Sequence, residues 1–168
     1  MKKLISAILL SVMALTLTAC GNAGGSQSEP PQQLDLTAFY DTMFNEIFPD
    51  PDNAPAMEQI TGDYLAQLYP GLSELETKQC LVYAPMISAV AYEVALVEAA
   101  NADDAAKVKE IFQARIDSQV EGGAFYPGTV EAWQNNSEIV TSGNYVCLFV
   151  GDVKDDMVAS FNALAQGQ

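Results

Sequence analysis

The chain has 168 residues, of which 22 are acidic and seven are basic, and it contains no histidine. Without histidine, Ser-His-Asp catalysis, Cys-His catalysis and imidazole metal sites are excluded. The net charge of −15 argues against nucleic acid as a partner, because binding to phosphates needs a basic surface.

The first 19 residues predict a lipoprotein signal peptide. Lys2 and Lys3 form a positive start, and residues 4–17 form an apolar run that is shorter than the roughly 20 apolar residues needed to span a bilayer. The run closes in Leu-Thr-Ala-Cys at residues 17–20, which resembles the lipobox of bacterial lipoproteins. Ordinary secretion, with a cysteine at this place by chance, is the alternative.

The lipobox resemblance implies that Cys20 is diacylated on its sulfur and becomes the first residue of the mature chain. Two acyl chains hold a protein on a membrane where one does not, so we expect a lipid anchor on the extracytoplasmic face of the cell membrane. Loss of Lys2 and Lys3 would leave five basic residues against 22 acidic ones, a net charge of −17. So acidic a protein attracts cations and basic proteins, although the charge can also serve solubility alone.

Composition separates a tether from a folded part. Residues 20–33 hold the lipidated cysteine and a small, polar, proline-bearing segment, which predicts a disordered tether. Residues 34–168, about 135 in number, have the length of a single domain.

Two helical patterns open this domain. Apolar residues recur at three- and four-residue spacing from Leu36 to Phe48, which predicts an amphipathic helix. Prolines at positions 49, 51 and 55 end that helix. A weaker stripe from Met57 to Leu68 predicts a second helix, which ends before the turn Tyr69-Pro70-Gly71.

Strand and helix patterns alternate in the rest of the domain. Asn101 is a candidate N-cap of a helix that ends at Gly122-Gly123, a short helix is expected around Trp133, and Asp152 is expected to cap the last helix. Four strands are expected, at residues 80–87, 91–99, 137–142 and 145–151.

The two pairs of predicted strands share the residues that flank them. Each pair follows a Tyr-Pro-Gly turn, at 69–71 and 126–128, and each precedes a helix that begins beside two aspartates. This ββα-ββα echo indicates either an internal duplication or the recurrence of one turn and cap chemistry. In both cases we expect an α+β fold, with a four-stranded, largely antiparallel sheet, helices on one face, and two N-terminal helices before it.

Five motifs in the later part of the chain carry a family resemblance. They are Leu-Tyr-Pro-Gly-Leu (68–72), Ala-Tyr-Glu-Val-Ala-Leu-Val-Glu-Ala (91–99), Asp-Asp-Ala-Ala-Lys-Val-Lys (103–109), Tyr-Pro-Gly (126–128) and Gly-Asn-Tyr-Val (143–146). Together they resemble a family of small bacterial lipoproteins, the domain of unknown function 4358. The resemblance implies a lipobox, a polar tether and one domain, and it implies no activity.

Cys80 and Cys147 are the two thiols that remain once Cys20 is acylated. An even pair outside the cytoplasm permits a disulfide, and burial of two free thiols within strands is the alternative. The sequence has no Cys-x-x-Cys motif to support redox catalysis, and we expect neither a cofactor nor a metal ion.

Glu93 is a carboxylate inside a predicted strand. On an exposed sheet face it would be an ordinary surface residue. In a concave face it would bind a ligand or act as an acid or base with a raised pKa. Glu93 is therefore the candidate ligand-binding residue.

The sequence favours a membrane-anchored extracytoplasmic lipoprotein that is a non-catalytic binding or accessory protein, with an envelope protein as its partner. The alternative is a small hydrolase that uses carboxylates, such as Glu93 with Asp152, or a metal ion. We predict no catalytic residue, because no nucleophile, base and orienting group can be assembled from the motifs.

Overall fold

The structure is a computed structural model that describes residues 33–87 and 89–166. The predicted signal peptide, Cys20 and residues 21–32 of the predicted tether lie outside the described residues. The helices and strands of the described residues fall within the unit of residues 32–168.

Five antiparallel strands form one sheet in the order β1-β2-β3-β5-β4. They are β1 (Met57–Gln59), β2 (Thr77–Pro85), β3 (Glu93–Ala99), β4 (Ser137–Ser142) and β5 (Tyr145–Val150). Every residue of strands β3 and β5 is buried except Tyr145, which is half-buried. The α+β class and the antiparallel pairing are confirmed, and the sheet has one strand more than predicted.

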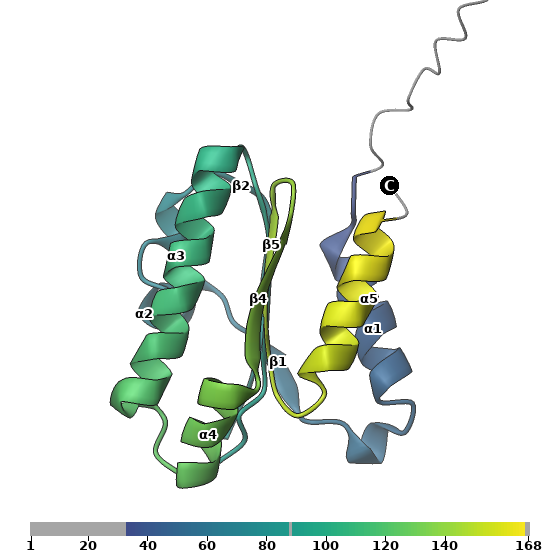
Figure 1. The fold of residues 1–168 in the computed structure, drawn as a ribbon, viewed down its shortest axis with the longest axis vertical. Helices are drawn as coiled ribbons and strands as arrows, with labels where there is room; N and C mark the ends of the chain where they lie inside the picture. Colours follow the sequence, from purple (N-terminus) through teal and green to yellow (C-terminus); the bar gives the residue numbers. More distant parts are fainter. Residues whose placement is uncertain (1–32, 88, 167–168) are drawn as a thin grey trace, which may run out of the picture. The chain divides into compact units, whose positions relative to one another are not determined.

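Helices cover both faces of the sheet, so the prediction of helices on one face is wrong (Figure 1). One face carries α2 (Gly62–Leu68), α3 (Ala102–Ser118) and α4 (Pro127–Asn135), and the other carries α1 (Leu36–Ile47) and α5 (Lys154–Gln166). The physical reason lies in β3 and β5, whose sequences are nearly continuous apolar runs. A strand that is apolar on both sides must be covered on both sides.

The additional strand replaces the start of the predicted second helix. Residues Met57–Gln59 pair with β2 at its far edge, with Met57 opposite Pro85, and α2 begins only at Gly62. The short apolar stripe fits either a helix or a strand, and a free edge of β2 decides the outcome in favour of pairing.

The two strand pairs have the repeated arrangement that the ββα-ββα echo predicts, whereas the helices that follow them do not. A half-turn about an axis normal to the sheet, between β3 and β5, exchanges the hairpins β2-β3 and β4-β5. Such a rotation leaves each face of the sheet in place, so a duplicated unit would carry α3 and α5 on the same face. They lie on opposite faces (Figure 1), so the ββα echo ends with the strands.

Gly151 forms the turn that carries the chain from β5 toward α5. Its φ of 136° is in the region that favours glycine, and its backbone N–H donates to the Asn136 carbonyl at 2.9 Å. A Cβ at this position would lie 2.7 Å from the ring of Tyr92. The predicted Asp152 cap is displaced by this turn, because α5 begins at Lys154.

The first helix forms as predicted. Asp35 accepts hydrogen bonds from the backbone N–H groups of Thr37 and Ala38 and so caps α1. The ring of Phe39 packs edge-on against Phe161 of α5 with centroids 5.9 Å apart. Four residues of its apolar stripe are buried: Leu36, Phe39, Tyr40 and Met43.

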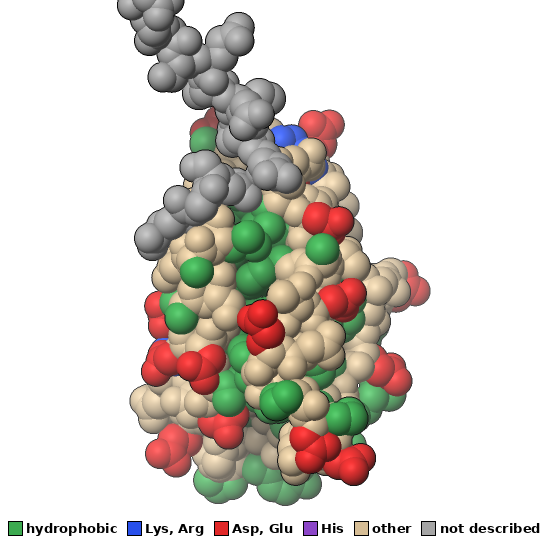
Figure 2. All heavy atoms as spheres, turned by 90° about the vertical axis from the view of Figure 1, so that its right-hand side faces the viewer, with side chains coloured by type: hydrophobic (Ala, Val, Ile, Leu, Met, Phe, Trp, Pro, Cys, Tyr) green, Lys and Arg blue, Asp and Glu red, His purple; other side chains and the backbone are tan. Residues whose placement is uncertain are grey.

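A shallow groove runs between α1 and α5. Its volume is about 890 Å³, and small side chains such as Ala38 and Ala163 line its walls. Figure 2 faces this layer and shows hydrophobic side chains along the seam, with acidic side chains spread around it. Its two carboxylates, Asp35 and Glu46, are both exposed, so the groove contains no buried charge.

Candidate functional site

Glu93 opens β3 on the face that α3 and α4 cover, and only 2% of its surface is exposed. The Arg115 guanidinium pairs with it at two points, with Nε donating to Oε1 at 3.0 Å and Nη2 donating to Oε2 at 2.8 Å. The Tyr69 hydroxyl also donates to Oε1. Both carboxylate oxygens are therefore occupied by donors from the protein.

Three separate elements bring these groups together. Arg115 projects from the last turn of α3, a helix capped by Asn101, whose side chain accepts from the Asp104 N–H at 2.9 Å as predicted. Tyr69 follows α2 at its C-cap. The next turn needs Gly71, whose φ is +89°, and it leaves the Tyr69 ring edge-on against Phe112 with centroids 5.5 Å apart.

Charge pairing offsets the cost of burying this cluster. Burial lowers the pKa of Arg115, but the hydrogen bonds and charge of Glu93 outweigh burial and raise it, so the guanidinium stays charged. Burial and the adjacent Glu93 both raise the pKa of the Tyr69 hydroxyl well above its usual value. Tyr69 therefore remains a hydrogen-bond donor to the carboxylate at any physiological pH.

Aromatic rings flank the guanidinium of Arg115. Its Cζ lies 5.7 Å from the centroid of Tyr69 and 5.1 Å from that of Trp133 in α4, distances at which a cation is attracted to the face of a ring. Trp133 is the single tryptophan of the chain. Its fluorescence is therefore a specific reporter of this site.

A pocket of about 340 Å³ opens above the ion pair, and we call it the Arg115 pocket. Glu93, Arg115 and Trp133 contribute to its floor. Its walls come from α2, from the β2–β3 connection, from α4 and from η3 (Gln119–Gly123), a wide helical turn that follows α3.

Large hydrophobic side chains crowd the mouth of the Arg115 pocket. Tyr64, Met86, Ile87 and Val90 line it, while Phe125 and Tyr126 follow the wall residue Ala124. Within the described part of the chain, seven large hydrophobic residues are exposed: four line this pocket, Phe125 and Tyr126 follow its wall residue Ala124, and Leu164 lies on α5. We call the group the apolar rim: Tyr64, Met86, Ile87, Val90, Phe125 and Tyr126.

The arrangement is suited to binding rather than to proton transfer. Both oxygens of Glu93 are engaged, and Asp152, its proposed catalytic partner, is an exposed residue of the β5–α5 turn with no hydrogen bond to Glu93. In residues 33–87 and 89–166 there is no group of three or more acidic or cysteine side chains placed to hold a metal ion.

Sequence reasoning found Glu93 and missed its partners. Arg115 is the only arginine of the chain, and it falls on the inner side of a helix. Because an unpaired buried charge is costly, this position was the signal that Arg115 needs a buried acidic partner. The sequence places Tyr69 in a turn and Trp133 in a short helix, and neither residue belongs to a local motif that points to a distant carboxylate.

Cys80 and Cys147 are free thiols on β2 and β5, the two strands that flank β3. Cys80 packs toward the α3 face and Cys147 is buried on the α1 face. Two strand spacings separate their strands by roughly 10 Å, whereas a disulfide needs Cα atoms within about 7 Å. A bridge between them would have to pass through β3.

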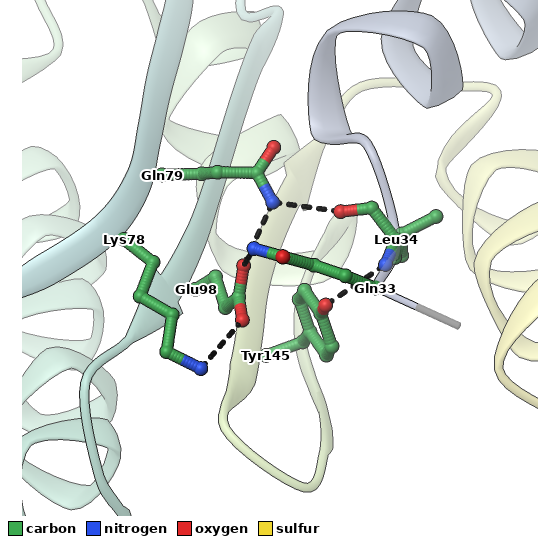
Figure 3. Close-up of polar contacts among 6 residues, drawn as sticks. All are labelled: Gln33, Leu34, Lys78, Gln79, Glu98 and Tyr145. Carbon is green, nitrogen blue, oxygen red and sulfur yellow. Dashed lines mark hydrogen bonds and ion pairs between the residues drawn. The ribbon is translucent and has the colours of Figure 1, made fainter. Parts of the chain in front are cut away.

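A second buried carboxylate, Glu98, fastens the start of the domain to the other face of the sheet (Figure 3). Lys78 donates to its Oε1 at 3.0 Å, and Gln79 and Gln33 donate to its Oε2 at 2.7 and 2.9 Å. We call this network, with Leu34 and Tyr145, the Glu98 clasp.

The Glu98 clasp also holds the backbone that leads into α1. The Gln79 side chain donates to the Leu34 carbonyl at 2.7 Å and accepts from the Leu36 N–H at 2.9 Å. The Tyr145 hydroxyl accepts from the Leu34 N–H at 2.9 Å. The hydrogen bonds of Glu98 lower its pKa despite its burial.

No helix within the described stretches is long and apolar enough to cross a membrane. The family described as Domain of unknown function (DUF4358) matches residues 50–151, more than half of the chain. This range spans the five strands and α2 to α4, and it leaves out α1 and α5. Comparison with curated proteins and with solved structures finds no significant match.

Proposed function

The chain belongs to the DUF4358 family, and we propose that it is a lipid-anchored extracytoplasmic protein that binds a ligand in the Arg115 pocket without catalysis. One observation supports binding above all. Four of the seven large hydrophobic residues that are exposed in the described part of the chain line one pocket, and this pocket also contains the buried Glu93–Arg115 ion pair. Contiguous exposed apolar surface is typical of interaction sites.

The sequence supports the anchor. Residues 17–20 have the lipobox pattern, and residues 21–32 supply polar chain between Cys20 and Gln33, the first residue of the Glu98 clasp. The domain begins at the Glu98 clasp, where Gln33 and Leu34 are bonded to the sheet. Tension from a membrane tether would therefore be transmitted to β2 and β3 rather than to the frayed end of a helix.

Metabolic labelling with an alkyne analogue of palmitate tests the anchor. We expect label on the native protein and a mass spectrum in which the chain begins at a diacylated Cys20. Cys20→Ala should abolish the label and the membrane association, whereas the matched control Cys80→Ala should retain both. An unlabelled protein, or one cleaved at another position, would overturn the anchor.

Photo-crosslinking in intact cells tests the pocket. A photoreactive amino acid placed at Ile87, in the apolar rim, should give a discrete adduct. The same amino acid at Leu164, an exposed hydrophobic position on α5, provides the matched control and should give none. Equal adducts from both positions, or no adduct from Ile87, would contradict binding in the Arg115 pocket.

A further inference from the structure

We propose that the Arg115 pocket binds a peptide segment of another protein, one with large apolar side chains flanked by lysine or arginine. This inference rests on the proposed binding function and specifies the class of ligand. It follows from three properties of the site: the apolar rim, the sign of the surrounding charges, and the N–H groups left free at the floor.

The apolar rim determines the core of the ligand. Met86 is 63% exposed, Ile87 is 61% exposed and Phe125 is 87% exposed, so each would release water on contact with an apolar partner. Methionine adapts its shape to different partners, and the aromatic rings offer large, rigid contact areas. Together these side chains suit bulky hydrophobic side chains that a peptide presents to the pocket.

The surrounding charges determine what flanks that core. Residues 57–68, 84–93 and 116–136, which supply the walls and the rim, contain no lysine and no arginine. Three of their acidic residues, Asp63, Glu121 and Glu131, are exposed on α2, η3 and α4. Elements that carry exposed acidic side chains and no basic ones, on a strongly acidic protein, attract positively charged flanks.

The Arg115 guanidinium on the floor keeps N–H groups that Glu93 does not engage. Glu93 engages Nε and Nη2 of Arg115, and Nη1 has no hydrogen-bond partner among the described residues. Because Glu93 neutralises the guanidinium, the floor does not attract a free carboxylate strongly. A neutral carbonyl oxygen, which every peptide bond carries, matches such a donor.

The same charges disfavour two other occupants of the apolar rim. A second copy of the chain would bring its own acidic side chains of α2, η3 and α4 toward those of the first, and like charges facing each other are costly. An anionic membrane surface would be repelled for the same reason. A basic, apolar peptide has neither penalty.

Selection from a display library of random twelve-residue peptides tests the proposal. The target is the protein purified from cells, held in nanodiscs or, if it carries no lipid, in buffer. We expect selected sequences with two or more bulky apolar residues and flanking Lys or Arg. A synthetic peptide of that sequence should change the fluorescence of Trp133, and replacing its Lys or Arg by Glu should weaken binding about tenfold or more.

Variants and salt complete the test. Ile87→Asp should weaken binding of the selected peptide about tenfold or more, and Leu164→Asp should leave it unchanged. Raising the salt from about 0.01 M to about 1 M, which shortens the Debye length from about 30 Å to about 3 Å, should reduce the advantage of the basic peptide over the acidic one.

Several results would overturn the peptide class. They are a library without enrichment, enriched sequences that are acidic or lack apolar residues, binding that is insensitive to Ile87→Asp, and a preference for vesicles of phosphatidylglycerol over the peptide. If any of these occurs while position 87 still crosslinks in cells, the binding function stands and only its ligand class fails. If position 87 does not crosslink, the proposed function itself fails.

Discussion

Glu93 and Glu98 lie five residues apart on β3 and point to opposite faces of the sheet, each buried and each paired with a single cation. Glu93 joins the α3 layer to the sheet through Arg115, and Glu98 joins the entry to α1 through Gln33 and Gln79. One central strand therefore carries both the floor of the pocket and the clasp of the N-terminal segment.

Removing Arg115 should destabilise the domain strongly. Arg115→Met leaves Glu93 as an unpaired buried charge, and we expect a loss of about 3–5 kcal/mol in the free energy of unfolding, measured by urea denaturation. The double variant Glu93→Gln with Arg115→Met should lose much less, because the amide is neutral and still accepts from Tyr69. A double variant as unstable as Arg115→Met would contradict the role of the ion pair.

The Glu98 clasp should make stability depend on pH. The pKa of Glu98 is lowered in the folded state, so its stabilising contribution is present above the pKa of an unfolded glutamate. That contribution is lost as the pH falls through the lower, folded pKa. Glu98→Gln should cost about 1–3 kcal/mol at neutral pH, and its difference from the wild type should shrink as the solution becomes acidic.

Glu138→Gln is the matched control for the clasp. Glu138 is 43% exposed in its ion pair with Lys154, so its replacement should cost less than about 1 kcal/mol. Chemical denaturation across a pH series measures both variants. A constant difference between Glu98→Gln and wild type at every pH would refute the linkage.

Gly151→Ala should destabilise the turn into α5. The new Cβ would meet the Tyr92 ring at 2.7 Å, and the backbone has a positive φ, so we expect a loss of about 1–3 kcal/mol. Gly128, in the first turn of α4, has open space around its Cα, and Gly128→Ala should be neutral or slightly stabilising. Thermal melting of both variants provides the comparison.

The buried Cys147 thiol should react only when the domain opens, and the half-buried Cys80 thiol should react more slowly than an exposed one. Burial raises the pKa of both Cys80 and Cys147, which makes the reactive thiolate scarce. Without reductant, a thiol reagent should label both residues slowly in native buffer and fully in concentrated guanidinium chloride. Intact mass then counts the labels, and a protein that gains none at these two positions under denaturing conditions would contain the bridge.

Several elements were predictable because their signals are local. The stripe from Leu36 to Phe48, the Asn101 cap and the neighbouring strands at 137–142 and 145–151 depend on residues within a few positions of one another. Short apolar stretches were ambiguous, and so Met57–Gln59 was predicted as helix although it forms an edge strand. That outcome depends on β2, which is distant in the sequence.

The site was predictable only in part. Glu93 stood out because a carboxylate is unusual within an apolar strand. Its partners could not be inferred, because Tyr69 and Arg115 are 24 and 22 residues away and no sequence spacing encodes which helix turn faces a given strand end. The apolar rim also escaped notice, since Met86, Ile87 and Phe125 resemble core residues until the fold leaves them exposed.

Composition and local patterns alone determined the acidic character, the absence of imidazole chemistry, the helix and strand alternation and the membership suggested by short motifs. The layer to which each helix belongs, the pairing of the single arginine with Glu93 and the separation of Cys80 from Cys147 were decided only by tertiary packing. The reason is that an apolar pattern on both sides of a strand predicts that helices cover both faces of the sheet. Which helix packs on which face depends on the direction that the connecting turns give to the chain, as the turn at Gly151 does for α5.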